Sequence, residues 1–387
     1  MTIKATTENV ASLVATKLTG AFPVLDGSAL TGIDSGPQSG ASDPTASTNP
    51  SGVGIVYENT TSGQMFICTS ATAGANVWLN VGSGNFSVGK CFGGQGGGTV
   101  AGFTSGGELS SQSTLINKYT FASANDATSH GVLTLGRGAT TGCSSVTHGF
   151  TGGGYGSGAY RNTIDKWAFS SNTTASDHGD LTAGLQSGTG NSSLTHGYIT
   201  GGASPAARST IDKFPFATNS GATDHGDLTT THYSGCGVDS YSHGYIMGGG
   251  GTPSGTIGYG QSFSHASAGN AVLHSNLTAA TVSSCPSSSN TDGYSAGGYP
   301  GSGNAINVIE KFSFSSTASA TDHGDLSVPR RVSAGSSSTT HGFVAGGQTL
   351  STTQVNVIDK FAFTSNTTAA DVGNLTAIRS ETTGHQN

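Results

Sequence analysis

The amino-acid sequence predicts an all-β protein whose larger part is a six-bladed β-propeller, and three observations support this fold class. The first is a repeat of about 48 residues, a length typical of propeller blades. It is marked by an aromatic residue shortly before paired glycines, at Phe103, Phe150, Tyr198, Tyr245, Tyr294 and Phe343. The second is that the repeats offer four short strand-like runs, the number of strands in one blade. The third is the composition.

The composition favours a protein built from small buried residues and tight turns. Hydrophobic residues make up only 33% of the 387 residues, but 62 glycines bring the apolar share close to the value usual for globular domains. Charged residues contribute 9%, so Ser, Thr and Asn supply most of the polar groups. The net charge of −7 argues against nucleic-acid binding, which normally requires a basic patch.

The four runs of a repeat are assigned to strands in chain order. In one repeat they are a small-residue segment (141–145), a His-Gly-aromatic run ending in Gly-Gly (148–153), an Ile-Asp-Lys run with two aromatics (164–169), and an Asp-His-Gly-Asp run (177–182). Paired aromatics such as Trp167 and Phe169 lie two residues apart, so both face one side of the strand. We expect them to pack against the neighbouring sheet.

Residues 1–83 are predicted to form a separate adaptor before a propeller over residues 84–387. A helix over residues 6–18 is predicted by an apolar stripe at helical spacing, Val10, Leu13, Val14 and Leu18. A helix of this length is not stable alone, so the stripe is expected to mediate oligomerisation or attachment. An extended connector should follow over 19–52. Short strands are then expected at 54–58, 64–68 and 76–81.

The C-terminal residues 378–387 are predicted to complete the first blade. The first repeat enters at its second strand, residues 100–103, with only a glycine run before it. The tail repeats the arginine-to-glycine spacing that leads into the first strand of inner repeats. Because proteins avoid unpaired strand edges, we expect the tail to supply the innermost strand and close the ring. Residues 86–92 are the alternative source of that strand.

Over about residues 98–387 the repeats resemble kelch repeats. The shared features are an apolar run ending in Gly-Gly, an aromatic third strand and a basic residue ahead of the next first strand, at Arg137, Arg330 or Arg331, and Arg379. The sequence departs from the family in lacking the regular tryptophan after the third strand, since Trp167 stands alone. The resemblance implies a binding module, although a few kelch propellers are enzymes.

The N-terminal part is similar to a different class of protein. Residues 18–33 and 63–78 resemble segments of bacteriophage tail-fibre and other virion structural proteins. This resemblance implies a structural protein of the phage virion, located on an exposed appendage, with other virion proteins as its partners. The analogy with fibres favours a homotrimer.

The residues able to carry catalytic or metal chemistry mostly recur at equivalent positions. Histidine does so twice, at His148, His196, His243 and His341, and at His130, His178, His225 and His323. Equivalent residues diverge around a ring, so structural hydrogen bonding is favoured over a metal site, with a central-channel ion as the alternative. Cys143, Cys236 and Cys285 are expected to be buried small residues. Without a catalytic motif, we expect neither an enzyme nor a cofactor, and no segment reaches the length of a membrane span.

A repeated lysine and aspartate suggest one further contact. Lys166, Lys213, Lys311 and Lys360 accompany Asp177, Asp224, Asp322 and Asp371, whereas the fourth repeat has lost both residue types. We therefore expect the pair to meet between adjacent strands, with coincidence in one degenerate repeat as the alternative.

The loops on one face vary between repeats and carry the predicted receptor-binding residues. These are Tyr155, Tyr160, Arg161, Tyr233, Tyr299, Arg137, Arg330, Arg331 and Arg379. Tyr and Arg are enriched at recognition surfaces. The predicted function is a tail fibre or related appendage that binds a host surface glycan or protein. The alternatives are a purely structural decoration or assembly protein of the capsid or tail and, third, a carbohydrate-active enzyme.

Overall fold

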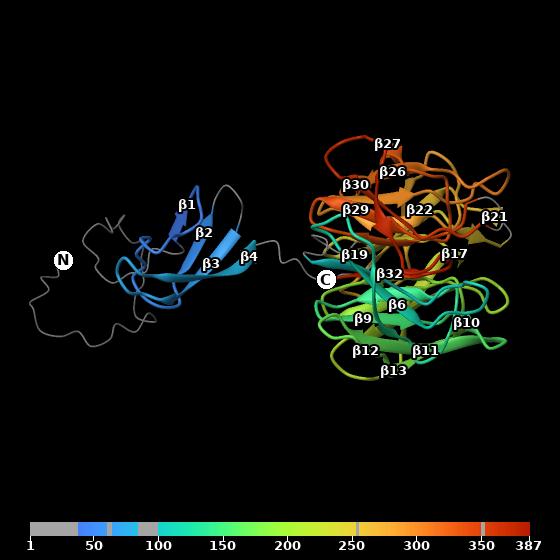
Figure 1. Ribbon diagram of the computed structural model, residues 1–387, viewed down its shortest axis with the longest axis horizontal. Helices are drawn as coiled ribbons and strands as arrows, with labels where there is room; N and C mark the ends of the chain where they lie inside the picture. The colour runs from blue at the N-terminus through green and yellow to red at the C-terminus, as the bar shows by residue number, and fades with distance from the viewer. Residues whose placement is uncertain (1–37, 60–63, 84–99, 253–254, 350–352) are drawn as a thin grey trace, which may run out of the picture. The chain divides into compact units, whose positions relative to one another are not determined.

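The computed structural model describes residues 38–59, 64–83, 100–252, 255–349 and 353–387 (Figure 1). The chain divides into two compact units, Met1–Asn85 and Phe86–Asn387. The predicted helix over residues 6–18, with Val10, Leu13, Val14 and Leu18, lies outside the described residues. Within the described ranges, no helix is long and apolar enough to cross a membrane.

The first unit contains a four-stranded sheet in the order β1-β2-β3-β4. The strands are β1 (Gln38–Gly40), β2 (Val56–Asn59), β3 (Gln64–Ser70) and β4 (Val77–Ser83). The last three confirm the predicted strands, while β1 lies in the expected connector and pairs in parallel with β2. Tyr57, Phe66 and Cys68 form its buried apolar centre, and the Tyr57 ring meets that of Trp78 at a centroid distance of 5.7 Å.

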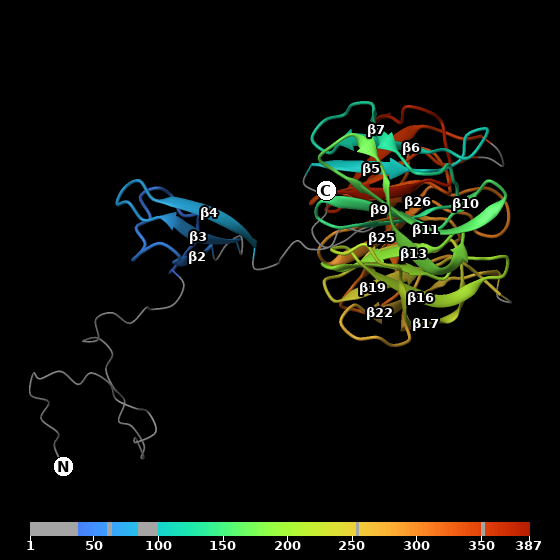
Figure 2. The ribbon, with the colours of Figure 1, turned by 90° about the horizontal axis from the view of Figure 1, so that it is seen from below.

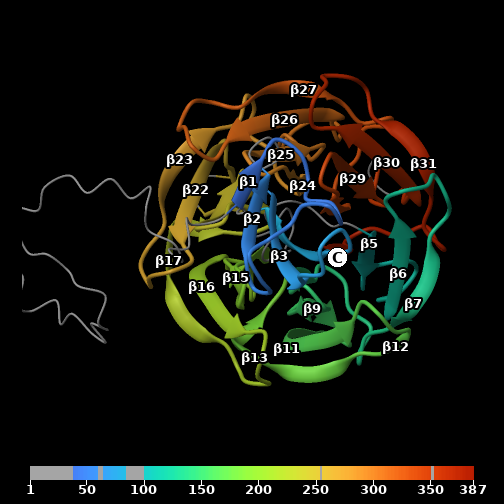
Figure 3. The same cartoon turned by 90° about the vertical axis from the view of Figure 1, so that its left-hand side faces the viewer.

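The second unit is all-β in its described part, and its sheets are arranged around a common centre (Figure 3). We number the six main sheets along the chain and give their strands from the innermost outward. Sheet 1 contains β32 (Thr383–Gln386), β5 (Ala101–Ser105), β6 (Leu115–Thr120) and β7 (Thr128–Val132). Sheet 2 contains β8 (Thr141–Ser144), β9 (His148–Gly152), β11 (Ala159–Ala168) and β13 (Ser176–Leu185). Sheet 3 contains β14 (Thr189–Ser192), β15 (His196–Thr200), β16 (Arg208–Pro215) and β17 (Thr223–His232).

The remaining three main sheets repeat this order. Sheet 4 contains β18 (Cys236–Asp239), β19 (His243–Met247), β22 (Tyr259–Ser264) and β23 (Val272–Asn276). Sheet 5 contains β24 (Cys285–Ser288), β25 (Asp292–Ala296), β26 (Val308–Ser313) and β27 (Thr321–Asp325). Sheet 6 contains β28 (Ala334–Ser337), β29 (His341–Ala345), β30 (Val357–Ala362) and β31 (Ala370–Asn374). The short strands β10 (Tyr155–Gly156), β12 (Thr173–Thr174), β20 (Gly250–Gly251) and β21 (Gly255–Thr256) extend the loops.

The C-terminal strand β32 pairs antiparallel with β5, matching Thr383 to Ser105 and Gln386 to Gly102. The C-terminus therefore lies beside the first strand of the second unit (Figures 2 and 3). The alternative strand over residues 86–92 lies outside the described residues.

Small residues fill the centre because the innermost strands approach each other closely. Each of these strands is buried along its whole length. A Cβ added at Gly384 would overlap the backbone of Gly335, and one added at Gly335 would overlap the carbonyl oxygen of Pro286. A larger side chain in these segments would force the strands apart. This explains why the first strand of each repeat is rich in Gly, Ser and Thr.

Aromatic side chains form the apolar cores between neighbouring sheets. Phe150 of sheet 2 packs against Phe214 and Phe216 of sheet 3, with ring centroids 5.7 and 4.7 Å apart. Phe103 of sheet 1 likewise packs against Trp167 and Phe169 of sheet 2. The prediction that the paired third-strand aromatics pack against the neighbouring sheet is therefore confirmed.

A polar link also connects each sheet to the next. The backbone N–H and hydroxyl of Thr134, after the outermost strand of sheet 1, donate to the carboxylate of Asp165 in sheet 2 at 2.9 and 2.7 Å. Asp212, Gln261, Glu310 and Asp359 accept equivalent bonds from Thr182, Thr229, Thr278 and Ser327. Thr376 of sheet 6 donates in the same way to Asn117 of sheet 1. We call these six contacts the threonine links, although one donor is a serine.

The predicted lysine–aspartate contact is wrong. Lys166 lies opposite Phe150 in the strand register, and its Nζ sits 5.8 Å from the centre of that ring. Asp177 instead accepts the backbone N–H of Gly179 at 2.9 Å. The same two arrangements recur for Lys213, Lys360, Asp224, Asp322 and Asp371. The two residue types recur together because each supports a different part of the same sheet.

The repeated histidines make structural hydrogen bonds, as the sequence interpretation favoured. The imidazole of His178 donates to the carbonyl oxygen of Pro215 in the next sheet at 2.8 Å. His130, His225 and His323 make the equivalent bond. In the second group, Nδ1 of His148 lies 2.8 Å from the hydroxyl of the preceding Thr147, and His196, His243 and His341 repeat this contact.

Candidate functional site

A cavity of about 280 Å³ is lined by the segments that lead into the innermost strands of sheets 1 to 6. Six equivalent residues border it, one before each innermost strand. They are Ala139, Ser187, Ser234, Ser283, Val332 and Glu381. All six have φ between 50° and 61°, in the left-handed region that non-glycine residues seldom occupy.

Backbone hydrogen bonds explain this shared conformation. The N–H of Ser187 donates to the carbonyl oxygen of Ala139 at 2.8 Å, and Ser234, Ser283, Val332 and Glu381 each donate to the preceding member of the series. The positive φ therefore belongs to the repeated framework and not to one specialised position. It fixes the border of the cavity, whereas its side chains differ from sheet to sheet.

A second set of variable residues lies immediately before this border. In every main sheet, a residue following the paired glycines forms an isolated bridge with a residue ahead of an innermost strand. The six pairs are Glu108–Ser380, Gly138–Tyr155, Gln186–Ala203, Tyr233–Gly250, Val282–Tyr299 and Arg331–Gln348. We call these twelve residues the rim. The loops that follow the paired glycines therefore meet the loops ahead of the innermost strands in pairs.

Six of the nine predicted receptor-binding residues lie on or beside the rim and are half-buried. Tyr155, Tyr233, Tyr299 and Arg331 belong to it, while Tyr160 and Arg161 follow on β11. The rings of Tyr155 and Tyr160 lie 5.4 Å apart, and the Arg331 guanidinium lies 5.0 Å from the centre of the Tyr299 ring. Arg161 donates twice to the carbonyl oxygen of Gly156. These contacts hold the side chains in fixed positions, as recognition requires.

The other three, Arg137, Arg330 and Arg379, are fully buried and cannot contact a receptor, which corrects the prediction. Arg137 forms an ion pair with Asp165 at 3.1 Å and Arg330 one with Asp359 at 2.8 Å. Arg379 donates to the carbonyl oxygens of Gly106 and Leu115 at 3.0 and 2.9 Å. Their charges are used inside the protein, where they satisfy backbone carbonyls and the acceptors of the threonine links.

The sequence interpretation missed two neighbouring carboxyl groups, that of Glu108 on the rim and that of Glu381 on the cavity border. A Cβ added at Gly138 would lie 2.7 Å from Cγ of Glu108 and 3.1 Å from Oε2 of Glu381, so both acids crowd this glycine. Burial, reinforced by the negative charge of Glu108, raises the pKa of Glu381 to about 7, against a smaller opposing effect of Arg331. The sequence did offer one sign of this carboxyl group, because Glu381 stands where the other five repeats have Ser, Ala or Val.

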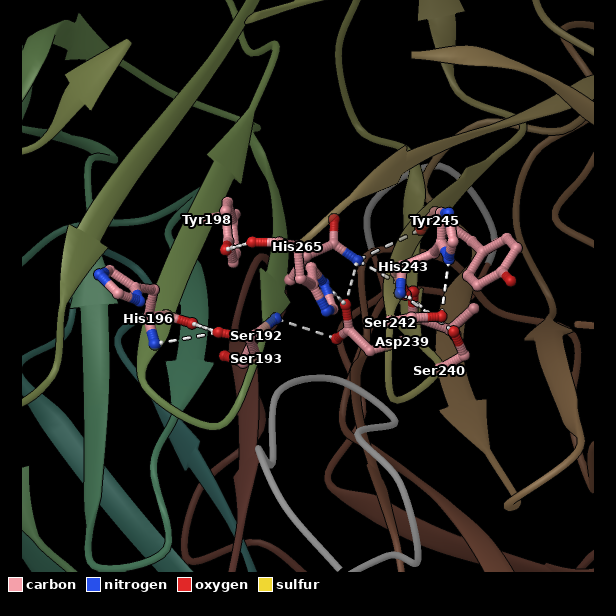
Figure 4. Close-up of polar contacts among 12 residues, drawn as sticks. Ser192, Ser193, His196, Tyr198, Asp239, Ser240, Ser242, His243, Tyr245 and His265 are labelled. Atoms are coloured by element: carbon pink, nitrogen blue, oxygen red, sulfur yellow. Dashed lines mark hydrogen bonds and ion pairs between the residues drawn. The ribbon is translucent and has the colours of Figure 1, made fainter. Parts of the chain in front are cut away.

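A buried acid–imidazole pair lies between sheets 3 and 4 (Figure 4). Oδ1 of Asp239 is 3.3 Å from Nε2 of His265, and the backbone N–H of Ser192 donates to Oδ2 at 3.0 Å. Asn191 donates to Oδ1 at 3.0 Å, and burial raises the pKa of Asp239. Asp239 is fully buried and His265 nearly so. The pair and its hydrogen bonds to Asn191 and Ser192 therefore join sheets 3 and 4 inside the protein.

No protein-family model matches the sequence, and no curated protein matches it. The fold resembles that of YjhT. Its solved structure, titled "Structure of YjhT", aligns with a TM-score of 0.57, covering 71% of this chain and 99% of that chain. At 13% identity, this similarity concerns the fold alone. It agrees with an all-β, propeller-like arrangement.

Polar side chains predominate around the cavity. The described residues contain no group of three or more His, Cys, Asp or Glu side chains that could hold a metal ion. Cys143, Cys236 and Cys285 are free and buried, as the sequence predicted. The cavity is lined by hydroxyl groups, Arg331 and Glu381. The rim adds tyrosine rings and the carboxyl group of Glu108, so that the two sets together can bind a polar ligand through hydrogen bonds and ring contacts.

Proposed function

We propose that sheets 1 to 6 form a closed six-bladed propeller completed by β32. The pairing of β32 with β5 supports this, as does the contact of β32 with β8 on one side and β28 on the other. The remaining innermost strands contact one another in the order β8, β14, β18, β24 and β28, so the series returns to its start. The threonine link from Thr376 to Asn117 joins the last sheet to the first in the same way.

We propose that this propeller is a binding module whose rim recognises a receptor on a host cell surface, a glycan or a protein. One observation carries the proposal: twelve rim positions share one backbone arrangement but differ in side chain, and two of them, Arg331 and Gln348, also line the cavity. Uniform scaffolds with variable loops are typical of recognition proteins. Tyr155, Tyr233 and Tyr299 supply rigid amphipathic contacts, and Arg331 supplies charge.

The resemblance of the N-terminal segments supports the rest of the proposal. The protein is a structural protein of a bacteriophage virion, a tail fibre or related exposed appendage, attached by its first unit to other virion proteins. The stripe of Val10, Leu13, Val14 and Leu18 makes it a homo-oligomer, with a trimer favoured. Neither nucleic acid nor membrane insertion is involved. A purely structural capsid or tail protein is the second candidate, favoured by how much of each repeat serves packing.

Replacing Tyr155, Tyr160, Arg161 and Tyr299 together with alanine tests the rim. We expect attachment to host cells to fall at least tenfold, because the removed side chains supply the ring contacts and hydrogen bonds. The melting temperature should change little, since none of the four is fully buried. A matched control replaces Val146 and Leu194, which are exposed at 52% and 45% on other turns. Attachment that survives the fourfold substitution would contradict the site.

A further inference from the structure

Sheet 4 breaks the repeated pattern on the side that faces sheet 5. In four other sheets, a third-strand lysine lies over the second-strand aromatic ring, with Nζ-to-centroid distances of 5.6 to 5.8 Å. In sheet 5, the equivalent Lys311 pairs with Asp292. In sheet 4, the residue opposite Tyr245 is Ser262, which is too short to cover the ring as Lys213 covers Tyr198.

The outermost strand of sheet 4 differs as well. In the other five sheets this strand carries a glycine with φ between 119° and 148°, and an added Cβ would overlap the carbonyl oxygen of a loop from the next sheet. These glycines are Gly131, Gly179, Gly226, Gly324 and Gly373. In β23 the equivalent residue, which follows His274, is the buried Ser275. The loop after β26 of sheet 5 still bonds to β23, since the N–H of Ala320 donates to the carbonyl oxygen of Asn276 at 2.7 Å. What sheet 4 lacks is the glycine that the other outermost strands carry beside this contact.

A hollow of about 570 Å³ lies at this junction. Two tyrosines, a phenylalanine and two histidines line it together with serine, threonine and asparagine side chains, and no Lys, Arg, Asp or Glu takes part. Tyr241 is 60% exposed. Phe314 is half-buried, whereas its counterparts Phe216 and Phe363 are only 7% exposed. The absence of the lysine and of the glycine from sheet 4 thus coincides with exposed surface on the rings of Tyr241 and Phe314.

This lining selects a particular class of ligand. The C–H face of a pyranose ring stacks on an aromatic ring, and its hydroxyl groups exchange hydrogen bonds with Ser, Thr, Asn and His. Burial lowers the pKa of His243, so its imidazole is neutral at neutral pH and both donates and accepts. Charged ligands find no ion-pair partner here. We infer that the hollow between sheets 4 and 5 binds a neutral saccharide, at a site separate from the rim.

Saturation-transfer NMR with the full chain tests this site. The probes are D-glucose, D-galactose, D-mannose and N-acetyl-D-glucosamine, each measured alone. We expect transfer to the ring protons of at least one sugar, and a loss of at least tenfold in two variants. Ser262→Lys restores the residue type of the other sheets and should cover Tyr245. Tyr241→Ala removes an exposed ring, so it leaves the fold intact even if the lysine does not.

The matched control is Lys213→Ser, which uncovers the ring of Tyr198 in sheet 3 without the other changes of sheet 4. It should bind sugar as the unaltered protein does. The inference is overturned if no sugar receives saturation, or if the signal persists in Ser262→Lys and Tyr241→Ala. A signal that is lost only in the fourfold rim variant would also overturn it, while supporting recognition at the rim. The two proposals therefore fail separately.

Discussion

Glu381, on the cavity border, changes its protonation state near neutral pH. Its carboxyl group lies in the first-sheet part of the cavity border, close to Glu108 and within the influence of Arg331. Because burial and Glu108 both oppose ionisation, a substantial share of Glu381 is protonated at neutral pH, where the group can donate as well as accept a hydrogen bond. Small changes of pH near 7 therefore alter the hydrogen-bonding groups on the cavity border.

Glu381→Gln should change how stability depends on pH. The folded-state pKa of about 7 lies above the ordinary value of 4.5, so the folded protein binds more protons than the unfolded chain between these values. Stability should therefore fall as pH rises from 4.5 to 7. The glutamine variant lacks this loss, so it should be more stable at pH 8 by about 1 kcal/mol, allowing for solvent screening. At pH 4 the two proteins should be close, as thermal melts at both pH values can check.

A second variant checks the cause. Glu108→Gln removes the neighbouring negative charge, so the pKa of Glu381 should fall and the pH-dependent loss should shrink. If Glu381→Gln and the unaltered protein lose stability in parallel between pH 5 and 8, the raised pKa is not the source.

At the residue scale, the sequence predicted repeats better than it predicted surfaces. Arg137, Arg330 and Arg379 recur at fixed spacing, and such regularity indicates a role in the framework, here the burial of a charge against Asp165 or Asp359. Equivalent positions hold Leu185, His232 and Thr281, so the arginine is not required in every sheet. The sequence placed the tail in the first blade, but the approach of Glu108 and Glu381 also depends on how closely their side chains crowd Gly138, which the repeat pattern does not specify.

Among the elements, β32 makes the most distant connection in the chain. Its His385 lies 2.9 Å from the hydroxyl of Ser105 and 3.1 Å from the carbonyl oxygen of Cys143, in two different sheets. Burial lowers the pKa of His385 to about 3, so the ring stays neutral at ordinary pH. The spacing of Arg379 and Gly384 was sufficient to predict this strand, because the tail repeats text found before inner strands.

Deleting residues 378–387 should destabilise the second unit far more than its length suggests. The deletion removes β32, uncovers β5 and takes Arg379 away from Gly106 and Leu115. We expect a broad, non-cooperative melt and increased binding of a hydrophobic dye, because an uncovered edge and its apolar neighbours meet water. The control is a second variant that lacks residues 1–83 and should melt cooperatively. A truncated tail that melts as sharply as the full chain would refute the role given to β32.

For the whole molecule, the sequence predicted the all-β fold class, but it placed three buried arginines, Arg137, Arg330 and Arg379, among the surface residues. The repeat length, the glycine content and the alternating aromatics reflect local strand and turn geometry. Such local geometry can be recognised in a single sequence. The cavity and the hollow beside Tyr241 arise where segments from different repeats meet, and their side chains follow no period. The absence of the lysine from the fourth repeat can be read from the sequence. That this absence coincides with an exposed surface is seen only from the positions of Ser275 and Phe314 in the structure.

The two units should separate functionally. A protein consisting of residues 86–387 should melt at the temperature of the second unit in the full chain, because its sheets pack with one another. It should sediment as a monomer, whereas the full chain should sediment as a trimer through residues 1–83. Analytical ultracentrifugation of both proteins measures this. A trimer formed by residues 86–387 alone would move the oligomer contact into the second unit.

The pairing of β32 with β5 also has a consequence during synthesis. Ser105 and His385, which meet in the finished protein, are 280 residues apart, so the ribosome produces β5 long before its partner exists. Until β32 emerges, one edge of β5 has no strand to pair with. Premature termination anywhere before residue 383 leaves that edge exposed permanently.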